Sequence, residues 1–297
     1  MKLADTIQNE YGTVSADQVR KNIVHTKELE QIVIKYKEWL NNIFENEYNL
    51  NGYHDKICTS AHNRVLNIES YSQEDIISFS CLLADFEDQT KKNILGAEIG
   101  FKSSGIFLSS LIKYHYEKTK TDMPYTLLVD HLSKKLDGIG YDTKGAKIKV
   151  EGSVGDLFAY QFSEGEIHVS GSVGYQACLY MSGGAVTITG NAQGLFCQQM
   201  AGGTVHLGGS IFAPKNNPYE SYSFFRMSGG EIHIKGDADY IGEVNGGRIY
   251  IDENAKRLWQ IQGGEIHIKG DFDKRNVDFS STMNGKIFLK DGEVIRA

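Results

Sequence analysis

Histidines are the most regularly placed residues that could do chemistry. His168, His206, His233 and His267 occupy the same place in short strand-like segments of the second half, and Tyr250 takes that place in another segment. His206 and His233 belong to consecutive segments, so adjacent strands would bring their rings within about 5 Å of each other. Two imidazoles at that distance could share a metal ion or respond to pH. We favour a simpler role, in which this column is a semi-apolar strip that packs against another surface.

A second group of potential ligands lies in the first half of the chain. His54, Cys58 and His62 recur at intervals of four residues, so they would form one stripe on a helix. Two of these side chains could bind zinc. No nearby acidic residue in the right register completes a metal-binding set, so we expect a structural role here, with no metal and no cofactor.

Acidic residues follow several strand-like segments of the second half. The carboxylates are those of Asp237, Asp239, Asp271 and Asp273. Carboxylate pairs are the catalytic groups of polysaccharide-cleaving enzymes, so catalysis on an extended polysaccharide is one interpretation. Asp237 and Asp271 directly follow a Lys-Gly turn, where Asp is favoured by turn geometry. We therefore expect no catalytic residue.

Residues 214–226 form an insertion that is rich in aromatic side chains. The segment holds Tyr219, Tyr222, Phe224, Phe225 and Arg226, together with two of the three prolines of the chain. Aromatic residues combined with arginine suit a protein contact site. Packing of the aromatics against the flank of the repeat would bury them equally well, and the sequence leaves both interpretations open.

These candidates must be positioned by a repeat that fills the second half. Eight segments alternate apolar and polar residues, and their first residues lie 19, 19, 19, 27, 17, 17 and 21 positions apart. Five segments follow a glycine pair. The segments begin at Lys147, Glu166, Ala185, Thr204, Glu231, Arg248, Glu265 and Lys286.

A period of this length is too short for helical repeats and is typical of one turn of a β-solenoid. Within a strand, Ile232 and Ile234 would face the core while Glu231, His233 and Lys235 face outward. Outer columns that alternate in charge, such as Glu231, Arg248, Glu265 and Lys286, support the same register. The glycine pairs suit corners that require a positive φ.

The first half has a helical pattern instead. Helices are predicted over about 15–48, 55–67, 72–86, 105–116 and 125–136, and the pattern changes at a glycine-punctuated segment, 137–140. The predicted fold class is α+β, with a helical domain at 1–140 and a parallel β-helix of about eight coils at 141–297. We expect the helical half to cap one end. The charged tail from Lys290 would protect the other end, unless the chain oligomerises there.

The second half resembles a known family. The pattern Met-small-Gly-Gly, then a strand and a glycine, resembles the GxGxG repeat domain, over residues from about 145 to 290. That domain occurs at the C-terminus of the glutamate synthase large subunit and forms a whole subunit of formylmethanofuran dehydrogenase. The resemblance implies a right-handed β-helix with an architectural role between catalytic domains or subunits. Further glycines of the family are replaced here in 177–180 and 195–199. The matching motifs begin at Met181, Met200 and Met227, with looser copies at Val244 and Ile261.

Composition excludes several classes of partner. The formal net charge is −7, and neither half is basic, so no nucleic-acid partner is expected. No apolar run approaches the ~20 residues that span a bilayer, and no secretory signal is visible, so we expect a cytoplasmic protein. The four cysteines form no CxxC motif and are expected to be reduced. Cys178 and Cys197 should stack in adjacent coils as a buried pair, with a disulfide or shared metal as the alternative.

We therefore predict a non-catalytic structural or interaction protein, whose β-helix binds protein partners or further copies of the chain. A non-catalytic subunit of a glutamate synthase-like or formylmethanofuran dehydrogenase-like oxidoreductase complex is an alternative, implied by the resemblance. An enzyme acting on an extended polysaccharide along the β-helix face is the third possibility.

Overall fold

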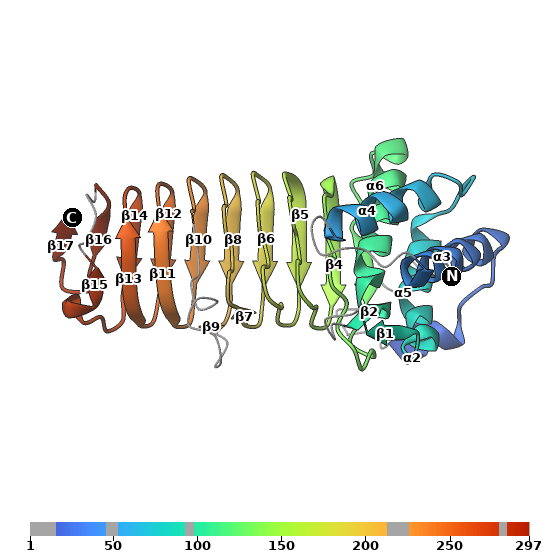
Figure 1. Ribbon diagram of the computed structural model, residues 1–297, viewed down its shortest axis with the longest axis horizontal. Helices are drawn as coiled ribbons and strands as arrows, with labels where there is room; N and C mark the ends of the chain where they lie inside the picture. The colour runs from blue at the N-terminus through green and yellow to red at the C-terminus, as the bar shows by residue number, and fades with distance from the viewer. Residues whose placement is uncertain (1–15, 46–52, 93–97, 213–225, 279–283, 297) are drawn as a thin grey trace.

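The computed structural model of the 297-residue chain describes residues 16–45, 53–92, 98–212, 226–278 and 284–296. It shows a helical N-terminal region followed by a β-solenoid of about eight turns, which confirms the predicted fold class. In Figure 1 the coils stand side by side along the long axis, with the helices at one end and the C-terminus at the other.

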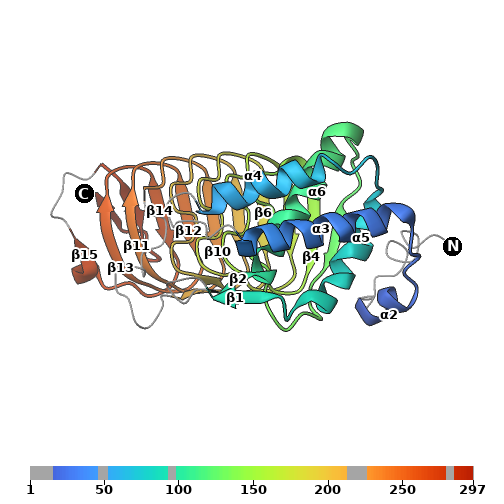
Figure 2. The ribbon, with the colours of Figure 1, turned by 45° about the vertical axis from the view of Figure 1, so that its right-hand side comes forward.

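The helical region consists of five described helices and a few short elements. The α-helices are α2 (Ala16–Lys21), α3 (Lys27–Glu45), α4 (Tyr53–Val65), α5 (Gln73–Leu82) and α6 (Ser104–Thr119). The short elements are the 3-10 turns η1 (Leu83–Phe86) and η2 (Phe101–Ser103) and the antiparallel pair of β1 (Thr90–Lys92) and β2 (Glu98–Gly100). Figure 2 shows the helices gathered around the first coils.

The helix predicted over 15–48 is in fact two helices, because Thr26 starts a new one. The backbone N–H of Leu29 donates to Thr26 Oγ1 over 2.9 Å, which is a helix N-cap contact. The Thr26 hydroxyl itself donates to Asp75 Oδ1 over 2.7 Å. Asp75 also forms a capping box with Ser72 at the start of α5, so one carboxylate ties the beginnings of two helices together.

The solenoid is built on one long sheet of ten strands. All its neighbouring strands run parallel except the last two, β16 and β17. The strands are, in spatial order, β3 (Tyr125–Leu128), β4 (Lys144–Glu151), β5 (Glu164–Val169), β6 (Ala185–Ile188), β8 (Thr204–Leu207), β10 (Glu231–Ile234), β12 (Arg248–Ile251), β14 (Glu265–Ile268), β16 (Lys286–Phe288) and β17 (Val294–Arg296).

The helix predicted over 125–136 is wrong, because its first residues form the strand β3. Tyr125 lies opposite Ile148 and Leu127 opposite Val150, in a parallel pairing with β4. The Leu128 N–H donates to Ser80 Oγ of α5 over 3.2 Å, so the strand is also tied to the helices. The sheet therefore begins before residue 141. The division of the chain into two domains, a helical one at 1–140 and a β-helix at 141–297, stays a prediction.

The predicted register of the eight repeats is confirmed. The pairings run Ile148 to Ile167, then to Val186, Val205 and Ile232, and continue to Ile287 without a shift. These inner side chains are at most 2% exposed. A period of two residues therefore determined which side chains face the core.

The glycine pairs have a structural explanation. The second glycine of each pair has a φ between +74° and +92°, which L-residues rarely adopt. A Cβ on Gly203 would also lie 2.7 Å from Met181 Cε of the preceding coil, and one on Gly230 would lie 2.6 Å from Met200 Cε. Each methionine methyl thus packs on the glycine of the next coil. This contact accounts for the recurrence of Met-small-Gly-Gly.

A second set of corners has left-handed backbone at alternate residues that are mostly not glycine. In the first coil these residues are Gly138, Gly140 and Asp142, so the glycine-punctuated segment belongs to the solenoid. In the next three coils the same positions hold, 19 residues apart, Leu157, Ala159 and Gln161, then Gln176, Cys178 and Tyr180, then Leu195, Cys197 and Gln199.

A short sheet forms another side of the later coils. Its strands are β7 (Ala192–Gln193), β9 (Ile211–Phe212), β11 (Ala238–Val244), β13 (Ala255–Ile261) and β15 (Val277–Asp278), all parallel. Buried residues form one continuous core that runs from Leu29 in α3 to Ile287 in β16. The helices and the solenoid are therefore packed as one body.

Candidate functional site

Five rings form an uninterrupted stack on the outer face of the long sheet, which we call the ring stack. The ring centroids of His206 and His233 lie 4.7 Å apart, and the distances to Tyr250, His267 and Phe288 are then 4.7, 4.7 and 4.3 Å. The interplanar angles range from 3° to 27°. The parallel strands set the spacing of this stack, because they place one ring on each strand at the interstrand distance, and the side-chain rotamers set the nearly parallel orientation of the rings.

His168 lies in the same column but not in the ring stack. Its register partner on the next strand is Thr187, which separates it from His206. The structure thus joins four of the predicted column residues with Phe288 and leaves His168 apart.

Stacking determines what the rings can bind. Each inner ring has both faces covered by its neighbours, so only ring edges are open to the outside. A sugar or a nucleobase that stacks on aromatic residues needs an open ring face. A shared metal needs lone pairs that converge, whereas the in-plane lone pairs of parallel imidazoles run side by side. Among the described residues no group of three or more His, Cys, Asp or Glu side chains could hold a metal ion.

Charged side chains flank the ring stack and are paired with one another. His233 Nε2 lies 2.6 Å from Glu231 Oε1, and Arg248 lies 3.1 Å from the other oxygen of Glu231. The hydrogen bond from His233 lowers the pKa of Glu231. The pattern repeats two strands on, where Glu265 lies 3.7 Å from His267 and 3.4 Å from Lys286.

The imidazoles of the stack differ in their surroundings. Desolvation, followed by the proximity of His233, lowers the pKa of His206. His267 Nε2 is buried and makes no hydrogen bond within the described chain, since Glu265 lies beyond hydrogen-bond distance. The side chain of His233 is 36% exposed and that of His267 is 30% exposed. The helical region therefore leaves much of these two side chains in contact with solvent.

The four acidic residues considered for catalysis have structural contacts. Asp237 Oδ1 accepts the backbone N–H of Asn254 over 2.9 Å, and Asp239 forms an ion pair with Lys256 at 2.5 Å. Asp273 caps the 3-10 turn η4 (Lys274–Asn276), and its pKa is lowered to about 2 by hydrogen bonds from Arg275. Asp271 pairs with Lys290. Each of the four carboxylates therefore has a partner within the solenoid.

Asp237 belongs to a row of side chains, which we call the acceptor ladder. Each side-chain oxygen of the row accepts the backbone N–H at the equivalent corner of the next coil, over 2.7 to 3.0 Å. Sequence reasoning missed this row, although its signal is a Ser, Asn or Asp at a constant place after each strand. The accepting residues are Ser153, Ser172, Asn191, Ser210, Asp237 and Asn254.

The histidine–cysteine stripe of the first half lies on α4, as predicted, beside the first coils. Cys58 and His62 line a cavity of about 220 Å³ with Lys113 and Asp142, which form an ion pair at 2.5 Å. Burial raises the pKa of Cys58 to about 11, so the group is a thiol at neutral pH and is a poor nucleophile and metal ligand. The side chain of His54 lies outside the described residues.

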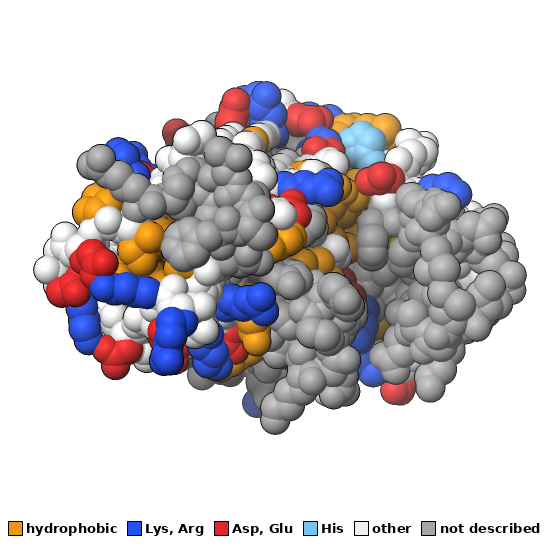
Figure 3. Space-filling view, turned by 60° about the vertical axis from the view of Figure 1, so that its left-hand side comes forward, with side chains coloured by type: hydrophobic (Ala, Val, Ile, Leu, Met, Phe, Trp, Pro, Cys, Tyr) orange, Lys and Arg blue, Asp and Glu red, His pale blue; other side chains and the backbone are white. Residues whose placement is uncertain are grey.

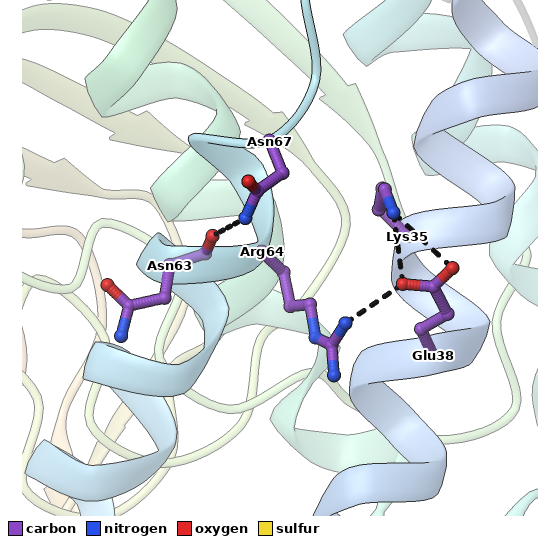
Figure 4. Close-up of polar contacts among 5 residues, drawn as sticks. All are labelled: Lys35, Glu38, Asn63, Arg64 and Asn67. Carbon is purple, nitrogen blue, oxygen red and sulfur yellow. Dashed lines mark hydrogen bonds and ion pairs between the residues drawn. The ribbon is translucent and has the colours of Figure 1, made fainter.

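A second polar surface lies between α3 and α4. Figure 4 shows Glu38 between Lys35 and Arg64, at 3.1 and 2.9 Å, while the Asn67 amide donates to the carbonyl of Asn63 over 2.7 Å. The Arg64–Glu38 ion pair joins α4 to α3, whereas the contacts of Lys35 and Asn67 lie within their own segments. The surface is therefore explained by packing of the helical region.

The remaining candidates are two buried cysteines, an ion-paired arginine and four aromatic residues that lie outside the part of the chain that the structure describes. Cys178 and Cys197 are both fully buried free thiols in the left-handed column, and burial and Cys178 raise the pKa of Cys197. Arg226 forms an ion pair with Glu243 at 3.2 Å. The predicted contact residues Tyr219, Tyr222, Phe224 and Phe225 are outside the described residues.

Comparisons with known proteins give no relative. No family model, curated protein or solved structure matches the chain. In the described part of the chain, no helix has the length and apolar character needed to cross a bilayer.

Proposed function

We propose that the protein is a non-catalytic, cytoplasmic scaffold that binds a protein partner along the outer face of the long sheet. The ring stack is the observation that carries this proposal. Five aligned rings form a rigid strip whose ring edges are partly exposed, and rigid aromatic groups lose little conformational entropy on binding.

The chemistry of the strip favours protein over other ligands. Imidazole and phenol edges offer hydrogen-bond donors and acceptors next to apolar carbon, which suits the mixed surface of a protein. The Glu231–Arg248 and Glu265–Lys286 ion pairs make one flank of the stack formally neutral, which gives a polyanion little to bind on that flank.

The alternatives have less support. A non-catalytic subunit of a glutamate synthase-like or formylmethanofuran dehydrogenase-like complex would use the same scaffold, but only the sequence resemblance favours it. Polysaccharide hydrolysis needs a pair of carboxylates with a general acid, and the candidate aspartates are bound to backbone N–H groups or paired with Lys and Arg.

A photo-crosslinking experiment tests the proposal. Replacing Tyr250 with a photoreactive phenylalanine analogue places the probe in the ring stack, and the matched control places it at Tyr180, another exposed aromatic residue. We expect a protein adduct in the native cell from position 250 and not from position 180. The adduct at 250 should also disappear when His233→Ala and His267→Ala break the stack. Adducts from both positions alike, or from neither, would contradict the proposal.

A further inference from the structure

The two ends of the solenoid are finished differently. At the first end, β3 is the edge of the long sheet, and α5 packs against it. At the other end the edge is β17, which pairs only with β16 among the described residues. We propose that two copies of the chain pair tail to tail through β17. This proposal concerns the end of the solenoid and does not depend on the ring-stack face.

The edge of β17 presents backbone hydrogen-bonding groups to the outside. The Leu289 N–H donates to the Glu293 carbonyl over 2.9 Å, and Ile287 lies opposite Ile295. Backbone groups of an antiparallel strand alternate in direction, so those of Glu293 and Ile295 point toward β16. The N–H and C=O groups of Val294 therefore point away from the sheet, where a further strand would lie.

The apolar interior is also less well covered at this end. Ile266 and Ile268 in β14 are 0% and 2% exposed. In contrast, Phe272, Leu289 and Ile295 at the last coil are only partly buried. Val294 lies opposite Phe288, and therefore on the outer face of the edge strand, where it is 39% exposed. Figure 3, in which the C-terminal end comes forward, shows hydrophobic side chains among charged ones of both signs. Another apolar surface with the cross-section of one coil would bury these side chains and extend the core.

A second copy fits this end better than another partner. The occupant must supply an edge strand together with an apolar core of the same cross-section, and the same end of another copy supplies both. The N-terminal end cannot do so, because helices cover it, and head-to-tail stacking is therefore excluded. A two-fold axis normal to the sheet places the two β17 strands antiparallel and keeps the inner side chains of both copies on one face.

Charge does not oppose this pairing. The segment 271–296 contains five acidic and five basic residues, so it is formally neutral, whereas the whole chain has a net charge of −7. Several of these charges are already paired within the copy, such as Lys290 with Asp271 and Lys274 with Glu293. Two neutral ends approach without the repulsion that the rest of the surface would cause.

Sedimentation velocity of the full chain tests the pairing. We expect the wild type to sediment as a dimer of 33.1 kDa subunits. Val294→Lys, which places a charge on the edge strand, should weaken the dimer at least about tenfold. Val24→Lys is the matched control, since Val24 is 73% exposed in the helical region, and it should leave the dimer unchanged. Far-ultraviolet circular dichroism checks that both variants fold.

Small-angle scattering of the wild type gives the arrangement without any variant. A tail-to-tail dimer nearly doubles the largest dimension of the particle, whereas a side-by-side dimer leaves it almost unchanged. A monomeric wild type up to about 100 µM, an unchanged largest dimension, or a Val294→Lys dimer as tight as the wild type would each overturn the proposal. Crosslinking from position 250 should persist in Val294→Lys, which separates this result from the ring-stack proposal.

Discussion

Asp137 stands where the helical region meets the first coil. Its Oδ1 accepts the backbone N–H of Asp156 over 2.8 Å, and its own N–H donates to the carbonyl of Lys102. Burial, reinforced by the nearby charge of Asp156, raises the pKa of Asp137 to about 7. A raised carboxyl pKa means that the folded state holds the proton more tightly than the unfolded state does.

Asp137→Asn should therefore stabilise the protein at alkaline pH. The contribution of Asp137 is fully present below its ordinary pKa of 3.8 and is lost as the pH rises through about 7. Asparagine keeps the acceptor oxygen without the charge. We expect a gain of up to about 4 kcal/mol in the free energy of unfolding at pH 8, shrinking as the pH falls toward 4. Urea unfolding across this range measures it, and a gain that does not change with pH would contradict the assignment.

Left-handed residues other than glycine give a second prediction at this scale. Gln176 has a φ of 58°, a conformation that costs an L-residue about 1–2 kcal/mol. Glycine avoids this strain but loses more entropy on folding, so Gln176→Gly should raise the free energy of unfolding by about 0.5–1 kcal/mol. Gln198→Gly is the control, because Gln198 is not left-handed, and it should be destabilising. Equal effects of the two changes would show that φ is not the cause.

At the scale of elements, the coils are held together by more than the sheet. The acceptor ladder links the corner of one coil to the backbone of the next along seven successive corners, from Ser153 to Asp271. At its end, Asp271 receives the Lys290 ammonium instead of a backbone N–H. Ser, Asn and Asp can replace one another in the ladder because each has a side-chain oxygen, close to the backbone, that accepts a hydrogen bond.

Asn191→Ala should interrupt this ladder. The N–H of Ser210, which now donates to Asn191 Oδ1 over 2.9 Å, would lose its protein acceptor. We expect a loss of about 1 kcal/mol in the free energy of unfolding, because the corner is exposed and water can replace part of the bond. Asn191→Ser should recover much of the loss, since Ser172 and Ser210 fill equivalent corners. Thermal and urea denaturation measure both variants, and equal losses from Ala and Ser would count against the ladder.

At the scale of the whole molecule, the helices and the solenoid share one core. The strand β3 completes the sheet edge beside β4, and α5 and α6 contact β3 and β4 respectively. Removing residues 1–140, which include β3 as well as the helices, would leave the edge of β4 open and would expose the apolar interior of the first coil. An open sheet edge over apolar side chains favours aggregation.

Residues 141–297 alone are therefore expected to aggregate or to unfold at a much lower temperature than the full chain. Sedimentation and thermal unfolding, each compared with the full chain, measure this outcome. A folded fragment with the stability of the full chain would instead support two independent domains divided near residue 140.

Periodicity explains why so much of the solenoid could be predicted. Alternation in strands such as 231–234 determines which side chains face inward, and a constant spacing then fixes the neighbours on adjacent strands. The alignment of His206, His233, Tyr250 and His267 in one column could be predicted from this spacing, because parallel strands in register place equivalent residues side by side. The stacking of the rings and the covering of their faces required the structure, because these depend on side-chain rotamers that no spacing specifies.

The sequence by itself determined the repeat, its register, its inner column and its glycine corners, because each arises from contacts between identical positions one coil apart. The tertiary structure alone decided the features that depend on distant partners. Residues 125–128 are a strand because β4 supplies hydrogen bonds, and the helices divide at Thr26 because Asp75 lies beside it. The left-handed backbone at Leu157 or Cys197 is likewise imposed by the coils on either side, since those residues alone favour other conformations.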